Sequence, residues 1–80
     1  IIYQTLKEAK NMVDRGERST EKLKKFIHDR IDSVELADIE YVEIVEDTML
    51  ESVDQIQPGT FAAVAVWFGD TRLIDNIILL

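Results

Sequence analysis

The sequence contains no cysteine, one proline and three glycines among its 80 residues. Without cysteine no disulfide and no Cys-x-x-Cys metal site can form. This usage fits a reducing compartment, so we expect a cytoplasmic protein. No hydrophobic run approaches the roughly 20 residues that a membrane-spanning helix needs. The chain also opens on Ile1 instead of methionine, from which we expect a processed chain or a fragment.

Basic residues are scarce in the second part of the chain. The whole sequence has 9 Lys and Arg against 16 Asp and Glu, a net charge of -7. Residues 1–36 hold eight basic and seven acidic side chains, whereas residues 37–80 hold Arg72 alone against nine acidic ones. An acidic surface repels the phosphates of nucleic acids and of anionic lipids, so we expect neither a nucleic acid nor a membrane as partner.

The first part of the chain has the periodicity of two helices. Gly16 predicts the end of the first helix, and Ser19 predicts the N-cap of the second, with Glu21 in its first turn. Each helix has apolar residues every three or four positions and therefore one apolar stripe. The stripes are Ile2, Leu6, Ala9 and Val13, then Leu23, Phe26, Ile27, Ile31 and Val34. Two helices joined by so short a link form a helical hairpin.

The second part predicts three strands, over Ile39–Val45, Phe61–Phe68 and Thr71–Leu79. Phe61–Phe68 has no polar residue, which is typical of a central strand covered on both faces. Gly69-Asp70 predicts a type II′ hairpin turn, and Pro58-Gly59 another turn. Between the first two strands we expect a loop. Alternation along the first strand places Ile39, Tyr41, Glu43 and Val45 on one face and Glu40, Val42, Ile44 and Glu46 on the other.

The predicted fold is a single α+β domain over residues 1–80, in the order α-α-β-β-β. Its helical hairpin packs on one face of a three-stranded, mainly antiparallel sheet. Alternation in the central strand leaves apolar residues on both sheet faces, and the hairpin can cover only one. Uncovered apolar surface indicates a partner. We therefore expect contact with another domain, or weak homodimerisation through the sheet when residues 1–80 are alone, helped by the apolar tail Ile77–Leu80.

No catalytic, cofactor-binding or metal site is expected within these residues. His28 has no second ligand or nucleophile, and we interpret it as a half-exposed helix residue. The acidic residues around the first strand are interpreted as a solvated edge, because a hard cation needs several converging oxygens. They are Glu40, Glu43, Glu46 and Asp47, of which alternation places Glu40 and Glu46 on one face and Glu43 on the other.

Four residues are candidates for facing another domain or a ligand. Arg72 would contact a substrate phosphate or carboxylate or a neighbouring domain, or else form a cross-strand ion pair, which we favour. Trp67 would be a stacking platform, a core residue or part of the surface that meets another domain. Asp75 and Asn76 are interpreted as turn, edge or interdomain hydrogen-bonding groups.

Two segments together resemble the C-terminal domain of the pantothenate synthetase (pantoate–β-alanine ligase) family. The first is Tyr41–Glu46 (Y-V-E-I-V-E) followed by Leu50–Val53, and the second is Ala63–Asn76, which ends in G-D-T-R-L-I-D-N. The family typically has Y-V-x-I-V-D, T-L-x-P and a late G-x-T-R-L-I-D-N. The chain departs from this pattern at three positions, Glu46, Met49 and Ser52.

The resemblance implies a lid or support domain of an enzyme that condenses pantoate with β-alanine. Such an enzyme uses Mg-ATP and a pantoyl adenylate and belongs to the biosynthesis of pantothenate and coenzyme A. The family's H-x-G-H and S-S-R-N motifs, which lie in or next to its nucleotide-binding domain, do not occur in these 80 residues. Residues 1–80 alone are therefore expected to be inert, with no cofactor of their own. The alternative is an independent acidic module that binds another protein.

Overall fold

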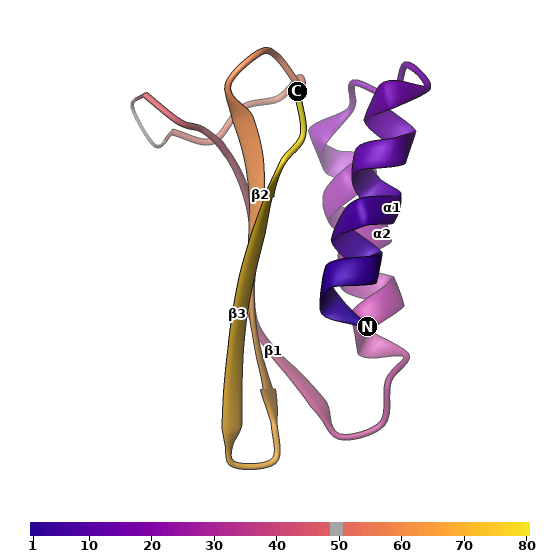
Figure 1. The fold of residues 1–80 in the computed structure, drawn as a ribbon, viewed down its shortest axis with the longest axis vertical. Coiled ribbons are helices and arrows are strands. Elements are labelled where there is room, and N and C mark those ends of the chain that lie inside the picture. The colour runs from indigo at the N-terminus through magenta and orange to yellow at the C-terminus, as the bar shows by residue number, and fades with distance from the viewer. Residues whose placement is uncertain (49–50) are drawn as a thin grey trace.

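The computed structural model describes residues 1–48 and 51–80. The described residues form α1 (Ile2–Asp14), α2 (Thr20–Asp32), β1 (Ala37–Glu46), β2 (Thr60–Phe68) and β3 (Thr71–Ile78). The predicted order and α+β class are confirmed. Figure 1 shows two layers, with both helices on one side of a twisted sheet. Met49 and Leu50, used in the sequence comparison above, lie outside the described residues.

Local hydrogen bonds fix both ends of the helical link. Gly16 has a φ of +109° and ends α1 in a Schellman motif. Its N–H donates to the carbonyl of Val13 at 2.9 Å, and that of Glu17 donates to Met12 at 2.9 Å. At the start of α2, the Ser19 hydroxyl accepts from the backbone N–H of Lys22, as the sequence predicts.

The sheet is antiparallel, with β2 between β1 and β3. The predicted central strand is thus confirmed. Gly69 has a φ of +62°, whereas Asp70 is not among the residues with positive φ, which fits the predicted type II′ turn. Phe68 and Thr71 close this turn as paired residues.

A β-bulge changes the faces that strict alternation gives for β1. The pairing shifts between Ile39, which opposes Val66, and Tyr41, which opposes Ala65, so Glu40 is the extra residue. The predicted faces of Ile39 and Glu40 are therefore wrong. Ile39 packs against the core on the helical side with Val42 and Ile44, whereas the Glu40 carboxylate bonds to side chains on the opposite face.

The hydrophobic core lies between the helices and one sheet face. It includes both predicted helical stripes except Val34, which lies beyond the end of α2 and is half-buried outside the core, while Phe26 is partly buried at the core's edge. Two segments outside the named helices and strands add to it: Ile56, 4% exposed, and Leu79, fully buried. Only part of the predicted apolar tail is therefore exposed, because its side chains alternate between the core and the surface. Ile77 and Leu79 point to the core and Ile78 and Leu80 are exposed.

Candidate functional site

The sheet face away from the helices carries apolar side chains that the described residues leave partly uncovered. We call this surface the open face. Cross-strand pairing defines it, since paired residues share a face. Ile78 is 68%, Ile74 56% and Trp67 37% exposed. Its apolar members are Tyr41, Val45, Phe61, Ala63, Ala65, Trp67, Ile74 and Ile78.

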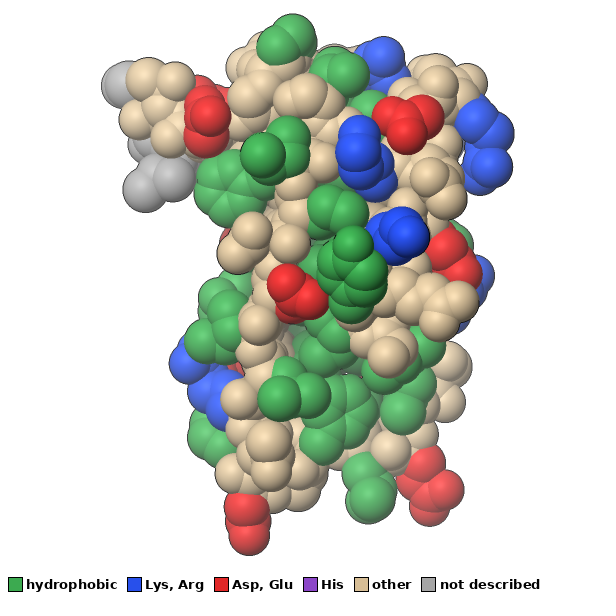
Figure 2. Space-filling view, viewed as in Figure 1, with side chains coloured by type: hydrophobic (Ala, Val, Ile, Leu, Met, Phe, Trp, Pro, Cys, Tyr) green, Lys and Arg blue, Asp and Glu red, His purple; other side chains and the backbone are tan. Residues whose placement is uncertain are grey.

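Figure 1 shows no helix of the described chain on this side of the sheet. In the edge-on view of Figure 2, hydrophobic side chains appear along the sheet margin as well as in the seam between β3 and α1. A contiguous apolar surface on a small domain is typical of a contact with another protein part.

One end of the open face is organised by the Glu40 carboxylate. Nε and Nη2 of Arg72 donate to Oε1 and Oε2 of Glu40, each at 2.9 Å, and Nε1 of Trp67 donates to Oε1 at 3.0 Å. The cross-strand ion pair favoured from the sequence is therefore present. Both charged side chains are half-exposed, at 38% for Arg72 and 40% for Glu40.

These bonds stabilise the charged forms of both groups. The hydrogen bonds from Arg72, and then from Trp67, hold the pKa of the Glu40 carboxyl below its ordinary value. The hydrogen bond to Glu40 raises the pKa of Arg72, which is in any case always protonated. The cluster is thus a fixed, charge-balanced pair at neutral pH.

The four candidate residues do not share one face. Trp67 and Arg72 lie on the open face as a directly paired couple, and Asn76 lies there opposite Ala63. Asp75 opposes Val64, a core residue, and so belongs to the helical side of the edge strand. Its Oδ1 accepts from the backbone N–H of Asn76 at 2.8 Å, a local role. Trp67 is not a core residue, because over a third of it is exposed.

The sequence did not identify Glu40 as the hydrogen-bond partner of Arg72 and Trp67. Arg72 is the one basic residue in 37–80, beside nine acidic residues, so the sequence indicates that it forms an ion pair with one of them. It cannot indicate which one, because strict alternation places Glu40 on the wrong face and only the bulge corrects it. The remaining acids do not gather: within residues 1–48 and 51–80, no three His, Cys, Asp or Glu side chains are placed to hold a metal ion.

His28 lies on the outer side of α2. Its side chain is 53% exposed, and Nδ1 lies 3.6 Å from Oδ1 of Asp29. No second imidazole accompanies it, since it is the one histidine of the sequence. The interpretation as a half-exposed helix residue agrees with this geometry.

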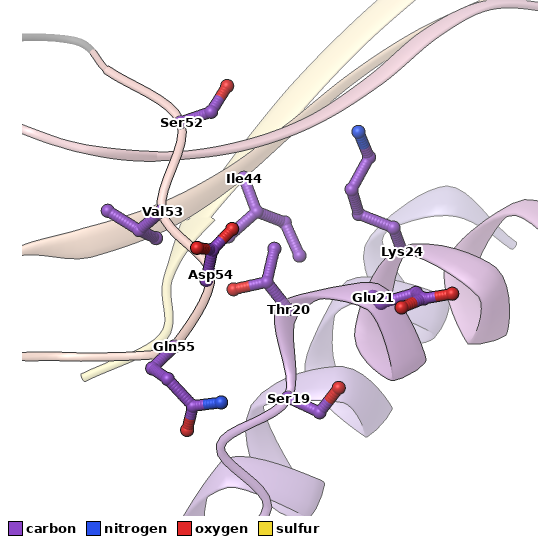
Figure 3. A pocket seen from close by; sticks show the side chains of 9 residues that line it. All are labelled: Ser19, Thr20, Glu21, Lys24, Ile44, Ser52, Val53, Asp54 and Gln55. Carbon is purple, nitrogen blue, oxygen red and sulfur yellow. The ribbon is translucent and has the colours of Figure 1, made fainter.

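A pocket of about 600 Å³ lies where α2 begins. Figure 3 shows the first residues of α2 facing the 52–55 segment, with Ile44 behind them. Thr20 is 7% exposed, and its hydroxyl has no hydrogen-bond partner among the described atoms. Two acidic side chains, Glu21 and Asp54, and one basic side chain, Lys24, line the pocket. Its lining residues are Ser19, Thr20, Glu21, Lys24, Ile44, Ser52, Val53, Asp54 and Gln55.

Neither described helix combines the length and the apolar character needed to cross a membrane. The described residues thus form a small α+β domain. Its helices cover one face of the sheet, and the open face stays partly exposed.

The family model of pantoate-beta-alanine ligase matches residues 1–78, and the chain belongs to this family. Pantothenate synthetase of Acetivibrio thermocellus is 44% identical over 79 residues, which are 99% of this chain and 28% of the relative. That of Thermotoga petrophila is 44% identical over 78 residues, 98% of this chain and 28% of the relative. The resemblance seen in the sequence is confirmed, and the chain spans about 28% of the length of these relatives.

A solved structure has the same fold. Pantothenate synthetase from Thermus thermophilus superposes with a TM-score of 0.87 at 22% identity, covering 98% of this chain and 28% of that one. At this identity the likeness supports the arrangement of helices and strands. It also places a domain of this kind within a chain several times longer.

Proposed function

We propose that residues 1–80 are the C-terminal lid or support domain of a pantoate–β-alanine ligase. The observation that carries the proposal is the family match over residues 1–78. The complete enzyme would use ATP to join pantoate to β-alanine in the cytoplasm, through the pantoyl adenylate that the family resemblance implies. ATP and its magnesium ion would be substrates held by the nucleotide-binding domain.

The role of this domain would be to cover the site. An acyl adenylate is readily hydrolysed, so an enzyme that forms one benefits from a cover that keeps water out. The open face supports this role, because its apolar side chains would be buried against the nucleotide-binding domain of the same chain. Trp67, Arg72 and Asn76 would face that domain. Asp75 lies on the helical side of β3 and would contact that domain only at the edge of the sheet.

The test compares the complete protein encoded by the reading frame that contains residues 1–80 with residues 1–80 alone. We expect the complete protein to form pantothenate and AMP from pantoate, β-alanine and ATP, and residues 1–80 alone to show no turnover above background. In calorimetry, residues 1–80 alone should bind ATP no more tightly than millimolar, since a surface of net charge -7 repels a polyphosphate. Turnover by residues 1–80, or a complete protein without this activity, would overturn the proposal.

The exposed apolar open face also favours a second candidate, an independent module that binds a protein through this face. Weak homodimerisation of residues 1–80 is expected under both proposals, because both leave the face uncovered in isolation. The reading frame separates them. A frame without an H-x-G-H motif upstream would support the module, and sedimentation over a concentration series would then measure its self-association.

A further inference from the structure

We propose that the free edge of the Arg72 guanidinium donates hydrogen bonds to main-chain carbonyl oxygens of the part of the ligase that covers the open face. This inference rests on the proposed function. It assigns to Arg72 a positioning role, which is to fix how the covering domain sits on the sheet.

Arg72 has more hydrogen-bond donors than the Glu40 carboxylate accepts. A guanidinium has five N–H donors in one plane. Arg72 uses Nε–H and one N–H of Nη2 on Glu40. Two donors on Nη1 and one on Nη2 have no hydrogen-bond partner among the described residues. Trp67 uses its single donor on Glu40. The free donors of this cluster therefore all belong to Arg72.

The β-bulge in β1 determines where the Glu40 carboxylate lies. Glu40 reaches the open face only because it is the extra residue in the pairing of β1 with β2. β-Bulges locally disrupt the ladder, and they commonly re-aim a side chain near a functional site. Here the re-aimed carboxylate clamps one edge of the guanidinium with two parallel bonds, which fixes the plane in which the other edge lies.

The charges near Arg72 favour a neutral acceptor for its free donors. Glu40 already balances the charge of Arg72, and residues 37–80 carry eight further acidic groups and no other basic one. A phosphate or a carboxylate would therefore meet net repulsion, whereas a neutral carbonyl oxygen would not. When the open face is covered, donors left without acceptors would be desolvated at a cost in free energy, so the covering surface has to supply oxygens there.

The test uses three variants of the complete protein. Arg72→Lys keeps the charge and a bond to Glu40 but loses the planar fork. Glu40→Gln removes the charge of the pair but keeps one side-chain oxygen that can accept from the guanidinium, so the free edge is held less firmly but is not lost. Arg30→Lys is the matched control, since Arg30 pairs with Glu8 on the helical hairpin and its side chain is 43% exposed, close to Arg72. Steady-state kcat and the KM for ATP are measured for each.

We expect Arg72→Lys to lower kcat by about tenfold, the effect of one lost hydrogen bond to a charged donor, with the KM for ATP unchanged within about twofold. Glu40→Gln should lower kcat by at most about threefold, and Arg30→Lys should match the wild type. If Arg72→Lys does not fold, Arg72→Gln should give the same pattern.

Three results would overturn the inference. Equal losses in Arg72→Lys and Glu40→Gln would show that the ion pair merely stabilises the sheet. A selective rise in the KM for ATP would show a phosphate contact. Wild-type kinetics in both Arg72 variants would show no role. An inactive wild-type complete protein would instead refute the proposed function, so the two failures are distinguishable.

Discussion

At the scale of single residues, the carboxylate of Glu40 determines the properties of one end of the open face. It accepts three hydrogen bonds, two from Arg72 and one from Trp67, and it is held by residues of β2 and β3 although it lies on β1. One acidic side chain therefore connects all three strands. Its protonation would release both partners at once.

This connection predicts a pH-dependent contribution to stability. The pKa of Glu40 lies below its ordinary value in the folded state, so the contribution is present above that value and is lost as the pH falls through the folded pKa. The free energy of unfolding of the wild type should exceed that of Glu40→Gln at about pH 6, and the difference should shrink by about pH 3. Urea denaturation at the two pH values measures it.

The control for this experiment removes the cause of the shift. In the Arg72→Gln background, Glu40→Gln should have a much smaller effect on the free energy of unfolding, and one that varies little with pH. Suppose instead that Glu40→Gln, made in the wild-type background, changed this free energy by the same amount at both pH values. The bonds from Arg72 and Trp67 to the carboxylate would then contribute nothing to stability.

At the scale of elements, the segment between β1 and β2 is part of the folded domain. Ile56 donates its backbone N–H to the carbonyl of Arg18 at 2.9 Å, and the carbonyl of Asp54 accepts from Thr20 at 3.3 Å. The Ile56 side chain then enters the core beside the helices. The link between α1 and α2 is thereby tied to the segment that precedes β2, and their contact forms one wall of the pocket in Figure 3.

We predict that Ile56→Ala lowers the free energy of unfolding by about 2–4 kcal/mol, because it leaves a cavity in the core. The matched control is Ile78→Ala, since Ile78 is 68% exposed on the open face and should cost less than about 1 kcal/mol. Chemical denaturation of residues 1–80 measures both. Equal costs would show that the 51–57 segment is not anchored as described.

The elements with regular patterns could be predicted from the sequence. Helical stripes, Gly16 and Ser19 predicted both helices to within a few residues, and the apolar run of β2 predicted the centre of the sheet. Ile56 was missed because one apolar residue in a polar segment has no periodicity. The bulge at Glu40 was missed because it depends on how β1 fits β2, which is a tertiary property. The partners of the candidate site depend on that bulge and were therefore only partly predictable.

At the scale of the whole molecule, the net negative charge and the uncovered apolar surface both belong to the sheet part. The helical part is nearly neutral, whereas the sheet part carries nine acids and one base. The helices cover one sheet face, and the open face stays partly exposed. The chain spans about 28% of the length of its relatives, and under the proposed function the open face would be buried against the remainder of a larger enzyme.

The measurement that tests this account most directly is the ligase activity of the complete protein carrying Ile74→Arg. Ile74 is 56% exposed on the open face, so an arginine there should leave the fold of residues 1–80 intact. Leu36→Arg, at a position 78% exposed on the link before β1, is the matched control. We predict that Ile74→Arg lowers kcat/KM by about tenfold or more, by placing a charge in the covered interface, while Leu36→Arg does not. Wild-type activity in Ile74→Arg would contradict the claim that the open face packs against the rest of the enzyme.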